Sequence, residues 1–248
     1  LLSDDDRYLD GTVTYILNVI ASGPFSLIYL NYYGFLTDPV KPSGYAIPGE
    51  TNRRFATGAD IMREQGVGHY SGFVYRSELA KQALKVAMER RPEITGTRSR
   101  CIFLEVAFRA TRDSGLPAFL TGKRLFAAKT DNPAGEPYLT LTHLTLESCR
   151  IFEYLFSENL IDRPMLLQRH RDASYRLPRL AVKDTWRMAP ADVRALIGEL
   201  DTRLLPFARY RLLGRPLLRL GCFGLTRFLF KMLYSFYRKS KSRQMVRD

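Results

Sequence analysis

The chain begins with two leucines and Ser3, followed by three consecutive carboxylates, Asp4, Asp5 and Asp6. Adjacent carboxylates repel one another, so each is stabilised by a nearby cation. A hard divalent cation such as Mg²⁺ or Mn²⁺ binds one or two carboxylates and completes its shell with diphosphate oxygens and water. We therefore predict that Asp4 and Asp6 bind the metal and that Asp5 contributes to the same ligand site. The alternative is a solvated loop that caps the next helix.

The elements around this triplet follow an order that is typical of an α/β fold. Leu1 to Ser3 is predicted to end a buried strand. Residues 11–21 carry apolar side chains at helical spacing, and residues 25–30 form a short apolar run typical of a strand. Together they predict a βαβ unit whose acidic turn lies at the carboxyl end of the first strand. Ligands of open α/β sheets bind at that end.

Downstream patterns extend this α/β prediction. Residues 31–55 are rich in Gly, Pro and polar side chains, which predicts a long loop. We expect a β segment over 68–75, helices over 78–89 and 97–113, and a strand over 116–125. Residues 131–135 are predicted to form a turn, and residues 139–160 a further helix.

The last part of the chain combines positive charge with bulky apolar residues. Between Tyr210 and Val246 there is no acidic residue, but there are nine basic ones. Gly214, Pro216, Gly221 and Gly224 are expected to break or bend a long helix. The pattern predicts a basic amphipathic segment on an anionic membrane surface. The alternative is a helix packed on the folded domain, with a disordered end.

Composition limits the class of protein. The formal net charge of +13 favours an anionic partner, which is a nucleic acid, a membrane surface or a phosphorylated ligand. The charge is concentrated in a terminal amphipathic segment and no nucleic-acid motif is present, so we expect no nucleic-acid partner. The three cysteines form no CxxC pair, which favours a reducing cytosolic setting.

A family resemblance adds to this interpretation. The stretch LLSDDDRYLDGTVTYILNVI resembles the metal-binding region of family 2 glycosyltransferases with a GT-A fold, and IYLNYYGF and HYSGFVYRSEL resemble segments that follow it. The similarity covers roughly residues 1–132. It is greatest to the abequosyltransferase-like group, which builds bacterial surface polysaccharides such as O-antigen.

The resemblance implies metal-dependent, inverting transfer of a sugar from a nucleotide-diphosphate donor to a glycan or lipid-linked acceptor. The family has a nucleotide-binding half ahead of the acidic triplet, so we expect a chain truncated at its amino terminus and inactive alone. We predict three regions: the carboxyl-terminal part of a Rossmann-like GT-A domain (1–137), a helical extension (138–205) and a basic membrane-associating tail (206–248). The expected location is the cytoplasmic, inner face of the plasma membrane.

An inverting transfer also needs a carboxylate that accepts the proton of the acceptor hydroxyl. Glu105 interrupts an apolar helical face in CIFLEVAF and is the first candidate, with Glu93 as the second. The alternative role for Glu105 is structural, in a pair with Arg100, Arg109 or Arg112.

Two further residues are candidate contacts to the acceptor or the diphosphate. His69 follows glycines that permit close approach of the backbone to a ligand, and Arg76 precedes a predicted helix. Their alternatives are a structural histidine and a solvated arginine. The competing functions are a non-catalytic, membrane-associated scaffold and a basic nucleic-acid-binding protein.

Overall fold

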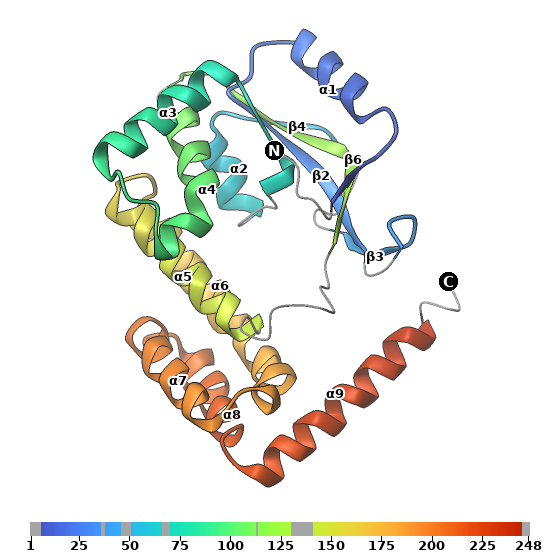
Figure 1. The fold of residues 1–248 in the computed structure, drawn as a ribbon, viewed down its shortest axis with the longest axis vertical. Helices are drawn as coiled ribbons and strands as arrows, with labels where there is room; N and C mark the ends of the chain where they lie inside the picture. Colours follow the sequence, from blue (N-terminus) through green and yellow to red (C-terminus); the bar gives the residue numbers. More distant parts are fainter. Residues whose placement is uncertain are drawn as a thin grey trace. The chain divides into compact units, whose positions relative to one another are not determined.

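The computed structural model describes residues 6–35, 38–45, 51–65, 70–112, 114–129 and 141–244 (Figure 1). The chain divides into two compact units. Unit 1 comprises residues 1–135 and 154–161, and unit 2 comprises residues 136–153 and 162–248. The predicted helical extension and basic tail therefore belong to one unit, apart from residues 154–161.

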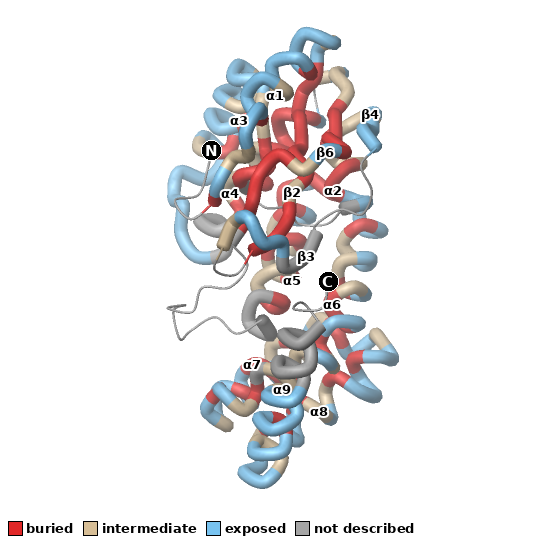
Figure 2. The backbone as a smooth tube through the Cα atoms, turned by 90° about the vertical axis from the view of Figure 1, so that its right-hand side faces the viewer, coloured by how far each residue is buried: buried red, intermediate tan, exposed pale blue. Residues whose placement is uncertain are grey.

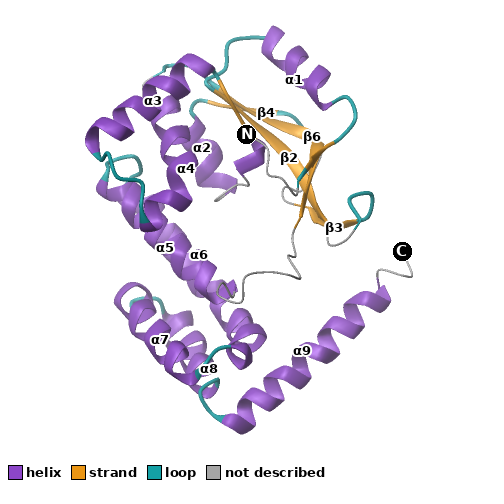
Figure 3. Cartoon of the chain, viewed as in Figure 1, coloured by secondary structure: helices purple, strands orange, loops and turns teal. Residues whose placement is uncertain are grey.

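Unit 1 is a mixed α/β unit, which confirms the predicted class (Figure 3). Its sheet has the strand order β1-β6-β2-β3, while β4 pairs with β6 and β5 pairs with β2. β2 and β6 run parallel, and the other described pairs are antiparallel. The strands are β1 (Arg7–Tyr8), β2 (Leu27–Phe35), β3 (Pro42–Tyr45), β4 (Arg53–Phe55), β5 (Phe73–Tyr75) and β6 (Ala118–Lys129).

The central strand β2 is longer than its apolar run predicts. The expectation of a loop over residues 31–55 is wrong at residues 31–35, which continue β2, and at β3 and β4. Asn31 is fully buried, and its amide Nδ2 donates to Gly122 O at 2.9 Å. Its backbone N–H donates to Thr121 Oγ1 at 2.8 Å where the β2–β6 register shifts. These long-range bonds satisfy polar groups that local sequence patterns assign to a loop.

The start of the predicted βαβ unit is described only in part. The strand expected at Leu1 to Ser3 lies outside the described residues. β1 follows the acidic triplet and runs antiparallel to β6, with Arg7 opposite Ala127. The expected helix is confirmed as α1 (Thr12–Ala21). Val19 of this helix packs with Ile28 and Leu30 of β2 in one hydrophobic cluster, so α1 covers one face of the sheet (Figure 1).

The other helices of unit 1 are α2 (Gly58–Gln65), α3 (Ser77–Arg90) and α4 (Gly96–Arg112). The predictions of helices over 78–89 and 97–113 are confirmed. Phe103 of α4 packs its ring against Phe73 of β5, and Phe73 packs against Tyr29 of β2. A layer of helices therefore lies against the sheet, which makes this half of the chain a layered α/β structure.

Unit 2 is helical in its described residues. It contains α6 (Arg163–Asp184), α7 (Pro190–Leu204), α8 (Arg215–Leu220) and α9 (Gly224–Gln244), with the 3₁₀ helix η2 (Thr185–Arg187) and the π-helix η3 (Tyr210–Gly214). Helix α5 (Leu141–Ser157), which confirms the helix predicted over 139–160, supplies residues to both units. The helix changes from π to α geometry at Gly214 without a break, whereas the break between α8 and α9 lies between Gly221 and Gly224, two of the glycines that predict it.

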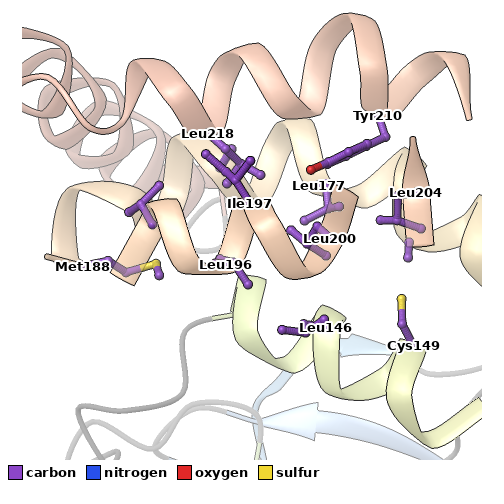
Figure 4. Close-up of a cluster of buried hydrophobic side chains, with 13 residues drawn as sticks. Leu146, Cys149, Leu177, Met188, Leu196, Ile197, Leu200, Leu204, Tyr210 and Leu218 are labelled. Atoms are coloured by element: carbon purple, nitrogen blue, oxygen red, sulfur yellow. The ribbon is translucent and has the colours of Figure 1, made fainter. Parts of the chain in front are cut away.

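An apolar cluster forms the core of the described part of unit 2 (Figure 4). It joins Leu146 of α5, Leu177 of α6, Leu200 of α7 and Leu218 of α8, and each of these side chains is buried. Tyr210 is also fully buried and donates its hydroxyl to Asp201 at 2.8 Å. None of the helices in the described part of the chain combines the length and apolar character needed to span a bilayer.

Candidate functional site

Asp6 is the member of the acidic triplet that the structure describes, since Asp4 and Asp5 lie outside the described residues. Its side chain is 8% exposed. Ser71 Oγ donates a hydrogen bond to Asp6 Oδ2 at 2.6 Å, and the two residues are 65 positions apart in the sequence. A short bond from a hydroxyl to a carboxylate holds that carboxylate in one orientation. Asp6 is therefore a carboxylate held in a fixed position immediately before β1.

Asp6 lies beside the carboxyl end of the parallel strand pair β2–β6, while the strand predicted to precede the triplet lies outside the described residues. Asp6 precedes Arg7, which pairs with Ala127 near the carboxyl end of β6. Ala127 lies opposite Tyr33, which is near the carboxyl end of the parallel strand β2. The carboxylate thus comes from the chain at the carboxyl end of the parallel pair, which is where open α/β sheets bind ligands.

A close approach of two backbones brings Ser71 to this position. Ser71 and Gly72 form the 3₁₀ helix η1 (Tyr70–Gly72), which precedes β5. A Cβ atom at Gly72 would lie 2.9 Å from Tyr29 Cε2 and 3.2 Å from Leu30 O. Because a larger residue does not fit there, glycine permits η1 to pack directly on β2.

The charge of Asp6 affects the pKa values of two nearby tyrosines, Tyr8 and Tyr32. Burial, followed by the charge of Asp6, raises the pKa of Tyr8 above its ordinary value. The same two causes raise the pKa of Tyr32, while a hydrogen bond with Tyr29 lowers it. Both phenols therefore remain neutral hydrogen-bonding groups at physiological pH. A desolvated carboxylate beside neutral hydroxyls favours a cation as ligand.

The residues present fit a hard divalent cation in the type of atom they offer. Asp6 provides carboxylate oxygen and Ser71 a hydroxyl oxygen, and Mg²⁺ commonly binds one or two carboxylates with substrate phosphates and water. Within the described residues there is no group of three His, Cys, Asp or Glu side chains placed to hold a metal ion. The predicted metal ligand Asp4 is not among those residues.

Of the two predicted contacts, His69 and Arg76, the structure describes only Arg76. His69 lies outside the described residues. Arg76 is exposed at the start of α3, and its Nε lies 3.7 Å from the carboxylate of Glu78. The solvated role that the sequence left open for Arg76 matches this position.

Glu105 lies in a buried polar cluster of unit 1. Its carboxylate is 0% exposed and accepts from Arg109 Nε at 2.9 Å and from the Tyr154 hydroxyl at 2.8 Å. Arg109 Nη2 also donates to Glu158 Oε2 at 2.8 Å, and Arg91 lies 3.0 Å from Glu158 Oε1. Glu105 therefore forms the Arg109 pair that the sequence gave as its structural alternative. The second candidate, Glu93, is exposed in the segment between α3 and α4.

Sequence reasoning missed Ser71, Tyr8 and Tyr32. In the stretch HYSGFVYRSEL the sequence predicted contacts from His69 and Arg76. The residue of this stretch that bonds Asp6 is Ser71, which precedes Gly72. A small polar residue before a glycine was the available signal, but its partner depends on the tertiary fold.

Comparison with known proteins found no match to a protein-family model, to a curated protein or to a solved structure.

Proposed function

We propose that unit 1 is the metal- and acceptor-binding part of a GT-A glycosyltransferase domain, which transfers a sugar from a nucleotide-diphosphate donor to a glycan acceptor. The observation that supports this most is the hydrogen bond between Ser71 and Asp6. Two separate segments carry the family resemblance, and this bond joins them. The location of Asp6 at the carboxyl ends of β2 and β6 gives further support.

In this proposal Asp4 and Asp6 would bind Mg²⁺ or Mn²⁺, and Asp5 would contribute to the same ligand site. The cation supplies charge neutralisation for the leaving diphosphate. Ser71 positions the Asp6 carboxylate for that role. The oxygen of an acceptor hydroxyl forms a bond to the anomeric carbon while the bond from that carbon to the diphosphate oxygen breaks. The bonding electron pair leaves with the nucleoside diphosphate, and a single displacement of this kind inverts the anomeric centre.

The proton of the acceptor hydroxyl passes to a carboxylate base. The assignment of Glu105 to that step stays a prediction. A base must reach the hydroxyl that it deprotonates, whereas both oxygens of Glu105 already accept hydrogen bonds inside unit 1. His69 and Arg76 likewise stay predicted contacts to the acceptor or the diphosphate. A lipid-linked acceptor at the cytoplasmic face of the plasma membrane completes the proposal.

The test uses the full-length product of the gene that encodes this chain. Binding of nucleoside diphosphates with Mn²⁺ is measured by calorimetry, and hydrolysis or transfer is measured with a panel of nucleotide sugars. Asp6→Asn is compared with Asp10→Asn, because Asp10 is an exposed carboxylate in the turn before α1. We expect Asp6→Asn to abolish metal-dependent binding and turnover, while Asp10→Asn retains both. Equal activity of the two variants would contradict the proposal.

One observation favours a second function, a non-catalytic membrane-associated scaffold. Helix α9 exposes a row of large apolar side chains although unit 2 already has a core. If no donor is bound or turned over while the protein binds membranes, this second function replaces the first.

A further inference from the structure

Helix α9 presents a row of large apolar side chains to solvent. Their exposed fractions range from 41% at Met232 to 76% at Leu225. The spacing of three and four residues places the row on one side of the helix. In Figure 2 this helix is mostly pale blue where its side chains are described. The row consists of Leu225, Phe228, Leu229, Met232, Leu233 and Phe236.

The opposite side of α9 already packs on the rest of unit 2. Phe230 is 6% exposed, and the ring of Tyr234 lies 6.2 Å from that of Trp186. Arg227 Nη2 donates to the Trp186 carbonyl at 3.0 Å. An amphipathic helix normally turns its apolar face toward the core. In α9 the core contacts lie on one side and the apolar row lies on the other.

Further large apolar side chains are exposed in the residues that precede α9. Leu212 and Leu213 of η3, Leu220 of α8 and Phe223 after it are all exposed, with Leu212 at 66% and Phe223 at 62%. An exposed row of large apolar side chains such as the one on α9 is rare in soluble proteins unless it binds another surface.

The charge of this segment indicates which kind of surface it binds. No acidic residue occurs between Tyr210 and Val246. Arg211, Arg219 and Lys231 have exposed side chains, and α9 continues through Arg238, Lys239, Lys241 and Arg243. A second copy of this chain would bring the same positive charge to the interface, which opposes association. A bilayer with anionic headgroups supplies negative charge and an apolar interior together.

We propose that the exposed row of α9 inserts into the headgroup region of an anionic lipid bilayer, with exposed basic side chains of the same segment of the chain on lipid phosphates. The helix lies in the plane of the interface, because its cations oppose burial across the hydrocarbon core. This inference does not depend on the glycosyltransferase proposal, since it concerns residues of unit 2 only.

The test is flotation of the full chain with vesicles of phosphatidylcholine alone or with roughly 30 mole per cent phosphatidylglycerol, whose anionic headgroups attract basic segments. The variant Phe228→Gln/Phe236→Gln removes apolar character from two exposed positions. Phe228→Leu/Phe236→Leu is the matched control, because it changes the same positions and keeps them apolar. Circular dichroism shows that the variants retain their helix content.

We expect the wild type and the Leu variant to bind anionic vesicles, and the Gln variant to bind about tenfold more weakly or less. Binding of all forms should fall at high salt and on neutral vesicles. Equal binding of the Gln and Leu variants would overturn the proposal. It would also be overturned by self-association that depends on Phe228 and Phe236 without vesicle binding, since a second copy would then cover the row. Sugar transfer is not part of this assay, so the two proposals fail separately.

Discussion

The Ser71 hydroxyl donates to the Asp6 carboxylate at 2.6 Å, and both side chains are buried. This bond connects the start of β1 to η1 across 65 positions of sequence. It fixes the one carboxylate of the acidic triplet whose surroundings the structure describes. The geometry of the proposed site therefore depends on a residue that carries no charge and that no motif singles out.

Replacement of Ser71 by alanine should destabilise unit 1 and weaken cation binding. The variant leaves the buried Asp6 without its hydroxyl donor, which costs about 1–3 kcal/mol of unfolding free energy. Urea unfolding followed by far-ultraviolet circular dichroism measures this change. Ser77→Ala is the control, because the Ser77 hydroxyl bonds the exposed Glu78. Similar unfolding free energies for the two variants would show that the Asp6 bond contributes little.

Gly72→Ala tests the close approach of η1 to β2. The added Cβ would lie 2.9 Å from the Tyr29 ring and 3.2 Å from the Leu30 carbonyl, so we expect a loss of about 1–3 kcal/mol from overpacking. Gly198→Ala in α7 meets no atom within 4 Å, and alanine should stabilise that helix by up to about 1 kcal/mol. Hydrogen exchange of the β2 amides reports the stability of unit 1, and exchange of the α7 amides reports that of unit 2. A neutral effect of Gly72→Ala would mean that η1 shifts freely.

Glu105→Gln distinguishes the structural role from the catalytic one. The variant keeps the shape of the side chain but removes the charge that pairs with the buried Arg109. If Glu105 is structural, the free energy of unfolding of unit 1 should fall by about 1–3 kcal/mol in the variant, while turnover per folded molecule stays the same. A large fall in kcat at unchanged stability would establish the catalytic role. Glu64→Gln is the control, because the Glu64 pair with Arg53 is exposed to solvent and contributes little to stability.

His170 should make the stability of unit 2 depend on pH. Burial lowers the pKa of His170 below its ordinary value, against the smaller opposing effect of Glu153. The positive charge of Arg203, which lies 2.9 Å from the Glu153 carboxylate, also lowers the pKa of His170. The folded state therefore binds its proton at lower pH than the unfolded state does.

This difference in pKa sets the direction in which the stability of unit 2 changes with pH. The contribution of neutral His170 is present above the unfolded pKa of about 6.5 and is lost as pH falls below it, by at most about 1.4 kcal/mol per pH unit. Unfolding followed by fluorescence of Trp186, the single tryptophan, reports on unit 2 between about pH 5 and pH 7.5. His170→Gln should reduce this pH dependence. An unchanged dependence in the variant would assign it to other groups.

The sequence determined the local elements and the type of chemistry that was available. Apolar spacing predicted α1, α3 and α4 within one or two residues, because helix formation there follows a local period. Three adjacent carboxylates and the basic segment after Tyr210 predicted a cation site and an anionic partner, because charge is a property of the residues themselves. The extension of β2 through residues 31–35 was missed, because it depends on pairing with β6, some 90 positions away.

The tertiary structure decided which of these groups meet. Ser71 reaches Asp6 because Gly72 packs on Tyr29, and Glu105 accepts a hydrogen bond from Tyr154 of α5, which lies 49 positions away. The apolar period of α9 was visible in the sequence, but the face that packs on Trp186 was not. Contacts between distant segments depend on how whole elements pack. Hydrophobic periodicity predicts which face of a helix is apolar, but it does not predict what that face packs against.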